Sequence, residues 1–344
     1  MKRKLILSIV IPLGIIVALF GGLYYETHRY VEPVVITDVG APAFYDPSAE
    51  NVSAGVGIYV LNVSELDLTT GSYWMDFYLT IDCDKPCTPY PDIMNAAGTP
   101  DIENQTGYKP GETFYSFRIR ANMLTEMNLA NFPFDEHQLV VLVEDKTAGV
   151  EDLVYWSNPN LSGVDENVHI AGWTLEPGWE AYTIDKVYPI YPGTYYSRYY
   201  YAITIAHPLF SSFMNSLFAA AVIVLVGLLS FIMRPEAAGE RLALTSSTLV
   251  ASILYHISLN SSIPPVGYLT YADKFMIANY LIVSLSVGIS AALMLLKDGR
   301  GKIAQTLHLW TRWSVPILWV LLIAGVTVWH FQGYAILEWF RALP

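Results

Sequence analysis

The stretch from residue 240 to residue 263 combines one carboxylate, several hydroxyls and large apolar side chains at a regular spacing. On a helix, residues three or four apart share a face. Starting from Glu240, this rule gives one stripe, which consists of Glu240, Ala243, Ser247, Val250, Leu254, Ile257 and Ser261. Several copies of such a helix around a shared axis would form a ring of carboxylates, then a hydroxyl ring, then apolar rings. Carboxylate rings favour cations, and apolar constrictions gate by dewetting. The residues alone also leave open that Glu240 and Arg241 are ordinary charges at a helix end.

The same stretch is polar for a segment long enough to cross a membrane. Residues 242–263 read LALTSSTLVASILYHISLNSSI, with hydroxyls, a histidine and an asparagine. Polar groups inside a membrane usually face a bundle interior or a water-filled path. We therefore expect one face of this helix to meet water. The alternative is a helix that is buried among its neighbours.

Other residue types that carry chemistry form no recognisable site. The only cysteines, Cys83 and Cys87, have no zinc-type cluster beside them, and both a local disulfide and free thiols stay open. The histidines His137, His169, His207 and His256 are scattered, without a nucleophile motif or a carboxylate pair. A sequence pI near 4.9 argues against nucleic-acid binding. We expect a protein that is not an enzyme and that holds no metal and no cofactor.

The apolar residues are concentrated in the second part of the chain. Of the 344 residues 53% are hydrophobic and 15% are charged, whereas a soluble globular chain carries about 25% charged residues. Between Pro33 and His207 there are 24 acidic and 7 basic residues. Segments long enough to cross a bilayer, which takes about 20 residues, span roughly 5–25, 209–233, 242–263, 275–296 and 315–336. The predicted domains are a signal peptide or N-terminal signal anchor (1–25), an acidic domain (33–207) and a membrane domain (208–344).

The basic residues agree on one membrane orientation. They cluster before the first segment, between the second and third, and between the fourth and fifth: Lys2, Arg3, Lys4, Arg234, Arg241, Lys297, Arg300, Lys302 and Arg312. The positive-inside rule assigns such clusters to the cytoplasm. The chain is therefore predicted to be a multi-pass plasma-membrane protein with its acidic domain outside the cell or in the periplasm.

Within the acidic domain the sequence alternates with a period of two. The runs GIYVLNVSEL (57–66) and SYWMDFYLTID (72–82) flank the turn-like LTTG at 68–71. Short β-branched and aromatic runs between Pro, Gly, Asn and Asp clusters indicate an antiparallel β-sandwich. The predicted fold class is an α+β membrane protein, with this sandwich followed by a four-helix transmembrane bundle.

Two stretches carry a resemblance to a known family. Asn131–Gln138 reads NFPFDEHQ and resembles the F/Y-P-x-D loop of the pentameric ligand-gated (Cys-loop) channel superfamily. Ser247–Tyr271 reads STLVASILYHISLNSSIPPVGYLTY and resembles the family's pore helix and following loop. Gly239-Glu240-Arg241 resembles the Gly-Glu-Lys that opens the pore helix of cation-conducting members. The resemblance runs from about Val52 to the C-terminus.

The chain also departs from the family pattern. The cysteines that bracket the loop in animal members fall on Thr125 and Leu139, so the loop disulfide is absent, as in prokaryotic relatives. The family's W-x-D is Cys83-Asp84-Lys85 here. The arginine that precedes the first channel helix, and that pairs with the loop aspartate (Asp135), is His207 here. A histidine supplies that charge only when it is protonated.

The resemblance implies a homopentamer in membrane lipid, with an agonist bound between subunits under an aromatic hairpin. The matching tyrosines are Tyr78, Tyr188, Tyr191, Tyr195 and Tyr196. Tyrosine faces hold cationic amines by cation–π contact, but a hairpin that packs its own rings is the alternative. Amines, protons and divalent metals stay open as ligands. The implied coupling residues are Phe132, Pro133, Asp135, His207 and Pro264.

The predicted function is that of a channel subunit. The channel is pentameric, ligand-gated and selective for inorganic cations, and it opens when a small-molecule agonist binds or when protons do. The alternative is a membrane-anchored extracellular binding or sensor protein without a conducting pore. Such an anchor has no use for the polar stripe.

Overall fold

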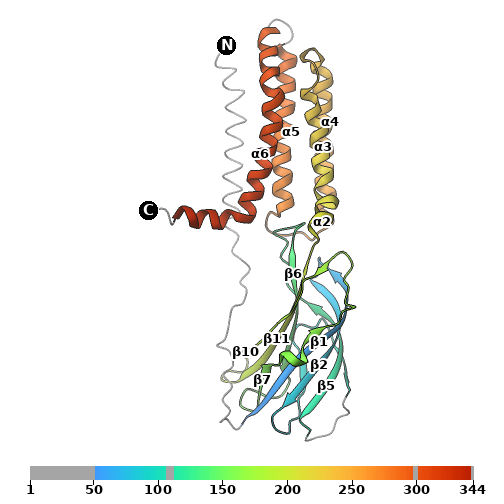
Figure 1. The fold of residues 1–344 in the computed structure, drawn as a ribbon, viewed down its shortest axis with the longest axis vertical. Helices are drawn as coiled ribbons and strands as arrows, with labels where there is room; N and C mark the ends of the chain where they lie inside the picture. Colours follow the sequence, from blue (N-terminus) through green and yellow to red (C-terminus); the bar gives the residue numbers. More distant parts are fainter. Residues whose placement is uncertain (1–50, 106–111, 297–300, 342–344) are drawn as a thin grey trace. The chain divides into compact units, whose positions relative to one another are not determined.

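The computed structural model describes residues 51–105, 112–296 and 301–341, and the side chains as far as residue 332 (Figure 1). The first predicted membrane segment and the 1–25 domain lie outside the described residues. The chain forms two compact units. One contains the strands. The other contains the helices that begin at Leu209, together with the short segment Leu129–Phe134.

The larger sheet of the strand unit has the order β4-β5-β2-β1-β7, and β8 also pairs with β1. Its strands are β1 (Val52–Asp67), β2 (Ser72–Cys83), β4 (Asp101–Asn104), β5 (Phe114–Leu124), β7 (Leu153–Ser157) and β8 (Gly163–Val164). The pairs β1–β2 and β2–β5 are antiparallel, as predicted. At one edge β7 and β8 run parallel to β1, so the sheet is mixed there.

The smaller sheet has the order β10-β11-β6-β3, with β9 paired to β11. Its strands are β3 (Pro91–Ile93), β6 (Glu136–Asp145), β9 (Thr174–Leu175), β10 (Glu180–Val187) and β11 (Tyr195–Ala206). A 3₁₀ turn, η1 (Pro159–Leu161), lies between β7 and β8. Antiparallel pairing joins β10 to β11 and β11 to β6.

The alternation seen in the sequence builds one core from both sheets. Every second residue of β2 is fully buried, and β11 repeats the pattern: Tyr73, Met75, Phe77, Leu79 and Ile81, with Tyr199, Tyr201, Ile203 and Ile205. Successive side chains of a strand point to opposite faces, so each strand gives one face to this core. Burying one such side chain contributes roughly 1.5–3 kcal/mol.

The predicted turn at 68–71 joins β1 to β2 and depends on its glycine. Gly71 has φ +69°, which favours a residue without a Cβ. A Cβ at this residue would also lie 2.3 Å from the carbonyl oxygen of Thr125. The turn sets the register in which Ile58 faces Leu79.

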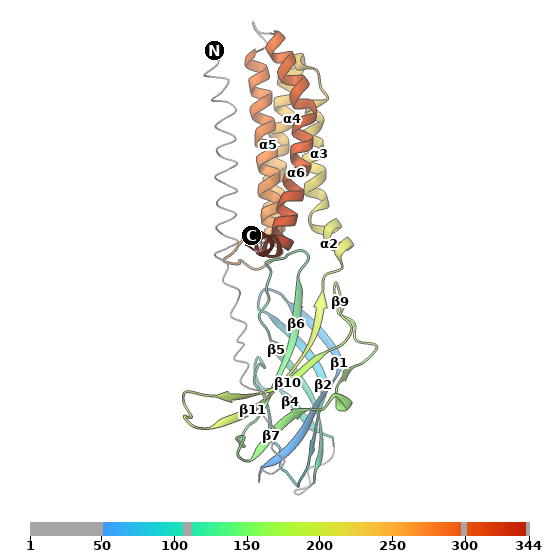
Figure 2. The ribbon, with the colours of Figure 1, turned by 60° about the vertical axis from the view of Figure 1, so that its left-hand side comes forward.

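Within the described residues, the helical unit contains three helices that are long and apolar enough to cross a membrane, and a bent pair that makes a fourth span if counted as one. The helices are α2 (Leu209–Ser216), α3 (Phe218–Leu228), α4 (Ala238–Asn260), α5 (Tyr271–Leu296) and α6 (Gly301–Arg341), with 3₁₀ turns η2 (Leu229–Phe231) and η3 (Pro235–Ala237). The predicted span 209–233 is broken at Leu217, where the chain bends by 50°. Figures 1 and 2 show α3, α4, α5 and α6 side by side as a bundle.

Three helices begin before the apolar runs that predicted them. The helix predicted from 242 begins at Ala238, the one predicted from 275 begins at Tyr271, and the one predicted from 315 begins at Gly301. Hydropathy detects only the part of a helix that lipid requires to be apolar. The polar residues 301–314 contain no Pro or Gly after Gly301, so nothing in them ends the helix. Pro316 lies inside α6.

Candidate functional site

All seven residues of the predicted stripe are exposed in the single chain, six of them on one face of α4 and the last, Ser261, at its C-cap. They are Glu240, Ala243, Ser247, Val250, Leu254, Ile257 and Ser261. The large apolar members are the most informative, because Val250, Leu254 and Ile257 are 57%, 62% and 63% exposed. The neighbouring helices therefore leave this whole face uncovered, from its carboxylate to its last serine.

The opposite face of α4 accounts for other polar residues of the segment. Thr245 and Thr248 are buried, and their hydroxyls donate to the carbonyls of Arg241 and Leu244 at 2.9 and 2.8 Å. Arg241 is fully buried, with Nη1 3.1 Å from Nδ1 of His308. Some of the polar side chains that suggested a water-facing helix are thus hydrogen-bonded inside the bundle instead. Glu240, one residue before Arg241, is exposed.

At the other end of α4, His256 and Asn260 reach one carboxylate at the start of α5. Nε2 of His256 lies 2.9 Å from Oδ1 of Asp273, and the amide of Asn260 donates to the same oxygen at 3.3 Å. Nδ1 of His256 lies 2.9 Å from the hydroxyl of Tyr280. Polar side chains therefore join the stripe-bearing helix to the next helix.

Asp273 also caps α5. Its Oδ2 accepts hydrogen bonds from the N–H and the hydroxyl of Thr270 at 2.9 and 2.8 Å. The N–H of Asp273 in turn donates to Oγ1 of Thr270 at 3.1 Å. This reciprocal pair is a capping box, which satisfies N–H groups that a helix start leaves without partners.

The segment Leu129–Phe134 satisfies two more donors at the same helix end. The N–H of Tyr271 donates to the carbonyl of Ala130 at 2.8 Å, and that of Ala272 donates to the carbonyl of Phe132 at 3.0 Å. The hydroxyl of Tyr268 accepts a hydrogen bond from the N–H of Leu129 at 2.9 Å. The N-terminal end of α5 is thus held by backbone of the segment Leu129–Phe134.

The side chains of this segment pack on the same helices. Phe132 and Pro133 are buried. The ring centroid of Phe134 lies 5.7 Å from that of Tyr271 and 6.4 Å from that of Phe331. Pro264, the last of the predicted coupling residues, lies in the α4–α5 connection that contains Tyr268.

Asp135, the next residue along the chain, belongs to the strand unit and is buried between two histidines. Oδ2 lies 2.6 Å from Nε2 of His137, and Oδ1 lies 3.0 Å from Nδ1 of His207. Burial alone would raise the pKa of Asp135, but the hydrogen bonds from both histidines outweigh it and hold the pKa at about 2. A carboxylate that is ionised at neutral pH can only accept hydrogen bonds. Nε2 of His137 and Nδ1 of His207 are therefore the ring nitrogens that carry a proton and donate it to Asp135 in a hydrogen bond. Trp173 stacks on His207 with ring centroids 3.6 Å apart.

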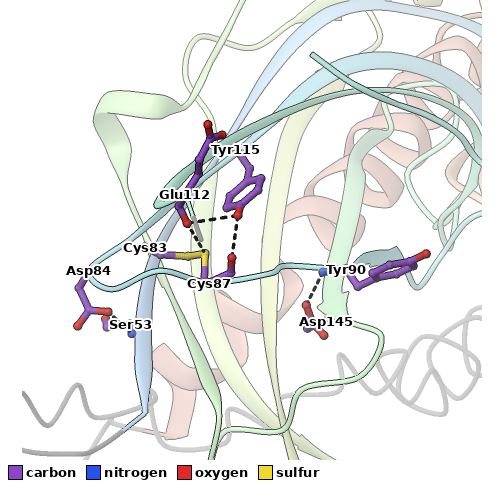
Figure 3. The surroundings of a disulfide bond; sticks show 8 residues. All are labelled: Ser53, Cys83, Asp84, Cys87, Tyr90, Glu112, Tyr115 and Asp145. Atoms are coloured by element: carbon purple, nitrogen blue, oxygen red, sulfur yellow. Dashed lines mark hydrogen bonds between the residues drawn. A yellow bond between two sulfur atoms is a disulfide. The ribbon is translucent and has the colours of Figure 1, made fainter. Parts of the chain in front are cut away.

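Thr125 and Leu139, the positions that the resemblance matches to the loop cysteines, lie near a hydrogen bond between the end of β5 and β6. The hydroxyl of Thr125 donates to the carbonyl of Gln138, next to Leu139, at 3.1 Å. The cysteines form a disulfide elsewhere, between Cys83 at the end of β2 and Cys87 (Figure 3). Of the two possibilities that the sequence left open for Cys83 and Cys87, the structure has the disulfide.

In the β10–β11 hairpin, Tyr188 belongs to a charged network. Its hydroxyl donates to both carboxylate oxygens of Glu144 at 3.0 Å, and Nη2 of Arg198 donates to that hydroxyl at 2.7 Å. Nε of Arg198 donates to Glu144 at 2.6 Å. Burial raises the pKa of Tyr188, so the hydroxyl keeps its proton at neutral pH. Tyr196 packs edge-on against Tyr188, with ring centroids 5.7 Å apart.

Of the other predicted ligand-binding tyrosines, Tyr191 and Tyr195 are exposed in the hairpin, and Tyr78 lies on the other sheet. Tyr191 and Tyr195 are 55% and 50% exposed. Tyr78 lies on β2 of the larger sheet, with the guanidinium of Arg118 6.0 Å from its ring centroid. One chain therefore does not join Tyr78 to the hairpin, which belongs to the smaller sheet.

Several residues of these sites were missed in the sequence. Glu144 and Arg198 lie at facing places on β6 and β11, and Asp273 is seventeen residues after His256. His207 meets Asp135, the partner that the resemblance implied for it, whereas His137, which meets the same carboxylate, was not expected there. A capping pattern, Thr followed three residues later by Asp, was the one local signal for Asp273. Within the described residues, no group of three or more His, Cys, Asp or Glu is arranged to hold a metal ion.

Comparisons with known proteins identify distant relatives. No family model matches the chain. The γ-aminobutyric acid receptor subunit rho-2 of Bos taurus is 26% identical over 183 residues, which is 52% of this chain and 38% of that protein. The rho-1 subunit of Homo sapiens is 26% identical over 180 residues (52% and 37%), and the rho-3 subunit of Rattus norvegicus is 24% identical over 180 residues (52% and 38%). The matched part thus spans less than two fifths of the length of these curated relatives. Over about half of its length, the chain is thus distantly similar to rho subunits of γ-aminobutyric acid receptors, and this similarity agrees with the resemblance of its loop and pore-helix motifs to pentameric ligand-gated channels.

Proposed function

We propose that the chain is one subunit of a homopentameric, ligand-gated, cation-selective channel of the plasma membrane. The observation that carries the proposal is the exposed face of α4. A helix of a bundle in lipid needs no carboxylate or serine on an uncovered face, because charged groups in lipid are costly. Five copies with this face around an axis would place Glu240, Ser247 and Ser261 in water and would bury the apolar members against one another.

The proposed selectivity follows from the only charge on that face. Glu240 is exposed in the first turn of α4, while the guanidinium of Arg241 is buried on the opposite side. Five carboxylates in a narrow ring attract cations and repel anions. The proposed gate consists of the next large apolar rings, from Val250, Leu254 and Ile257.

The proposed agonist is a small molecule with an ammonium group, bound at the β10–β11 hairpin. Exposed Tyr191 and Tyr195 offer ring faces for cation–π contact. Glu144 is already neutralised by Arg198, so it fixes Tyr188 rather than offering a free charge. Tyr78 would complete the site from a neighbouring subunit, because its own sheet does not bring it to the hairpin. Protons are the other candidate agonist, since His207 and His137 surround Asp135.

The proposed transmission path uses the contacts at the start of α5. A shift of the strand unit reaches Phe134 over the peptide bond to Asp135. The carbonyls of Ala130 and Phe132 bind the first N–H groups of α5, and Asp273 binds His256 on α4. Ligand binding can move this path only by its difference in affinity between the closed and open states.

Current through the purified full-length chain in planar bilayers tests the proposal. Ammonium ligands, including γ-aminobutyric acid, and protons are applied separately. Native mass spectrometry in detergent is expected to give a pentamer. An agonist-dependent cation current supports the channel. A monomer as the only species, with no current under any ligand or pH, would instead favour the membrane-anchored sensor.

A further inference from the structure

A row of three residues crosses the outer face of the larger sheet near the end of β2. Gly55 on β1 pairs with Asp82 on one side and with Trp156 on the other. The indole covers Gly55 closely, because a Cβ there would lie 2.7 Å from Cζ2 of Trp156. Trp156 is nevertheless 41% exposed. The sheet therefore presents an accessible indole beside a carboxylate.

A pocket of about 500 Å³ occupies this place. It is lined by Ser53, Asp82, Cys83, Asp84 and Trp156. Asp82 and Asp84 are both exposed, and no ion pair with either carboxylate occurs within the described part of the chain. Negative charge thus lines one side of the pocket and an aromatic ring lines the other.

The backbone around the pocket is held in place. The N–H of Ser53 donates to Oδ1 of Asp84 at 2.9 Å, and the N–H of Asp84 donates to the carbonyl of Ser53 at 2.9 Å. Directly beside them, the Cys83–Cys87 disulfide closes the loop that carries Asp84 (Figure 3). The nearby ammonium of Lys85 donates to the carbonyl of Asn51 at 3.1 Å. The pocket is therefore built on fixed backbone.

One buried polar group of the pocket has no partner. Ser53 is 5% exposed, and its hydroxyl makes no hydrogen bond within the residues that the structure describes. On β1 the side chains of Ala54 and Val56 enter the core, so Ser53 points to the same side as Gly55 and the indole. An unmade hydrogen bond of a buried hydroxyl is costly. A ligand donor or acceptor in the pocket would remove that cost.

We propose that this pocket binds a small organic cation, a primary ammonium carried on an aromatic or alkyl group. The ammonium has three donors, which match Asp82, the second oxygen of Asp84 and the hydroxyl of Ser53. The indole is the best aromatic partner for a cation. Calcium is a poorer match, because it takes six to eight oxygen ligands, and one wall here is an indole. This site lies on the larger sheet and does not depend on the hairpin site of the smaller sheet.

Calorimetric titration of the full-length chain in detergent with benzylammonium tests the proposal. We expect saturable binding, with the neutral isostere benzyl alcohol binding at least tenfold more weakly. Asp82→Asn removes one charge from an exposed side chain and is expected to weaken binding about tenfold, with the thermal unfolding midpoint unchanged. Glu176→Gln, an exposed acid outside the pocket, is the matched control and should leave affinity unchanged.

Four further variants separate ligand contact from structure. Trp156→Leu should weaken binding three- to tenfold, and Trp156→Phe should recover part of that loss. Ser53→Ala should weaken binding without lowering the unfolding midpoint, because the lost hydroxyl had no partner. Tyr195→Ala in the hairpin removes only binding at the hairpin site, so it should leave intact the component of benzylammonium binding that Asp82→Asn weakens.

Four results would overturn the proposal. They are the absence of saturable binding, equal binding of benzyl alcohol, loss of binding in Tyr195→Ala but not in Asp82→Asn, and tighter binding of calcium that Asp82→Asn abolishes. The last result would identify a metal site. None of these results bears on whether the chain conducts ions, which is measured separately.

Discussion

His256 Nε2 lies 2.9 Å from Asp273 Oδ1, and this contact joins α4 to the residue that caps α5. The N–H groups of Tyr271 and Ala272, at the same end of α5, bind carbonyls of the Leu129–Phe134 segment. A displacement of that segment therefore has a short polar route to the helix that carries the exposed stripe.

The first prediction concerns this contact. His256→Ala is expected to raise the agonist concentration for half-maximal current about fivefold or more, since coupling energies of about 1–3 kcal/mol correspond to 5–150-fold. Asp273→Asn should act in the same direction, and the double variant should be no worse than the stronger single one. Current recordings give the midpoints. Ser258→Ala, at an exposed serine of the same helix, is the control, and additive effects of the two variants would contradict direct coupling.

The second prediction concerns charge selectivity. Glu240→Gln removes the only charge on the exposed stripe, so the reversal potential under a salt gradient should move from near the cation value towards zero. Glu236→Gln removes an equal charge from an exposed residue of η3, just before α4, and should change the potential much less. A wild-type channel that passes chloride, or a Glu240 variant with full selectivity, would assign the filter elsewhere.

The third prediction concerns the gate. Val250→Ser places five hydroxyls in the narrow apolar part of the stripe, which lowers the cost of hydrating it. Open probability should rise at low agonist, or without agonist, in single-channel recordings. Ile253→Ser is the matched control, because Ile253 is 43% exposed on α4 but lies off the stripe. Equal effects of the two substitutions would remove Val250 from the gate.

The fourth prediction concerns the hairpin. Tyr195→Ala removes an exposed ring and should raise the agonist midpoint about tenfold, while single-channel conductance stays the same. Tyr188→Phe should raise it less, since the Glu144–Arg198 pair remains. Tyr182→Ala removes a ring from β10 that stacks on Tyr200, and it is the control for general damage to the hairpin. A changed conductance in Tyr195→Ala would mean that the residue acts on the pore.

The fifth prediction concerns Asp135 and acid. Its pKa of about 2 lies below the ordinary value of 3.8. The ionised carboxylate therefore contributes stability above about pH 4, and that stability is lost as pH falls through about 2. Asp135→Asn should cost about 2 kcal/mol near neutral pH, since one unit of pKa corresponds to about 1.4 kcal/mol. Thermal unfolding against pH should show a weaker acid dependence in this variant than in the exposed control Asp152→Asn.

The sequence predicts what depends on local repetition. The period-two runs around 68–71 become β1 and β2, and the three- and four-residue spacing from Glu240 becomes one exposed face of α4. Helix bounds were less accurate, because hydropathy cannot detect a polar first turn such as that of α6. The break at Leu217 lies ten residues before the first glycine of the predicted span, Gly227, and the span contains no Pro, so we have no local signal for the break.

Contacts between distant residues could not be predicted in this way. Arg198 meets Glu144 because β11 pairs with β6, and His207 reaches Asp135 because the same strand ends beside the start of β6. Such pairs depend on sheet register, which no single run of residues contains. The resemblance supplied Asp135 and His207 as partners, but it gave no indication of His137.

The membership of Leu129–Phe134 in the helical unit has a practical consequence for chimeras. A hybrid receptor cut only at Pro208 would combine foreign helices with a native segment whose carbonyls no longer match the first turn of α5. The exchangeable cassette is instead discontinuous, and it consists of residues 129–134 together with everything from Leu209 onward. A graft that moves both pieces keeps the hydrogen bonds from the N–H groups of Tyr271 and Ala272. Asp135 then stays together with His137 and His207 in the protein that supplies the strands.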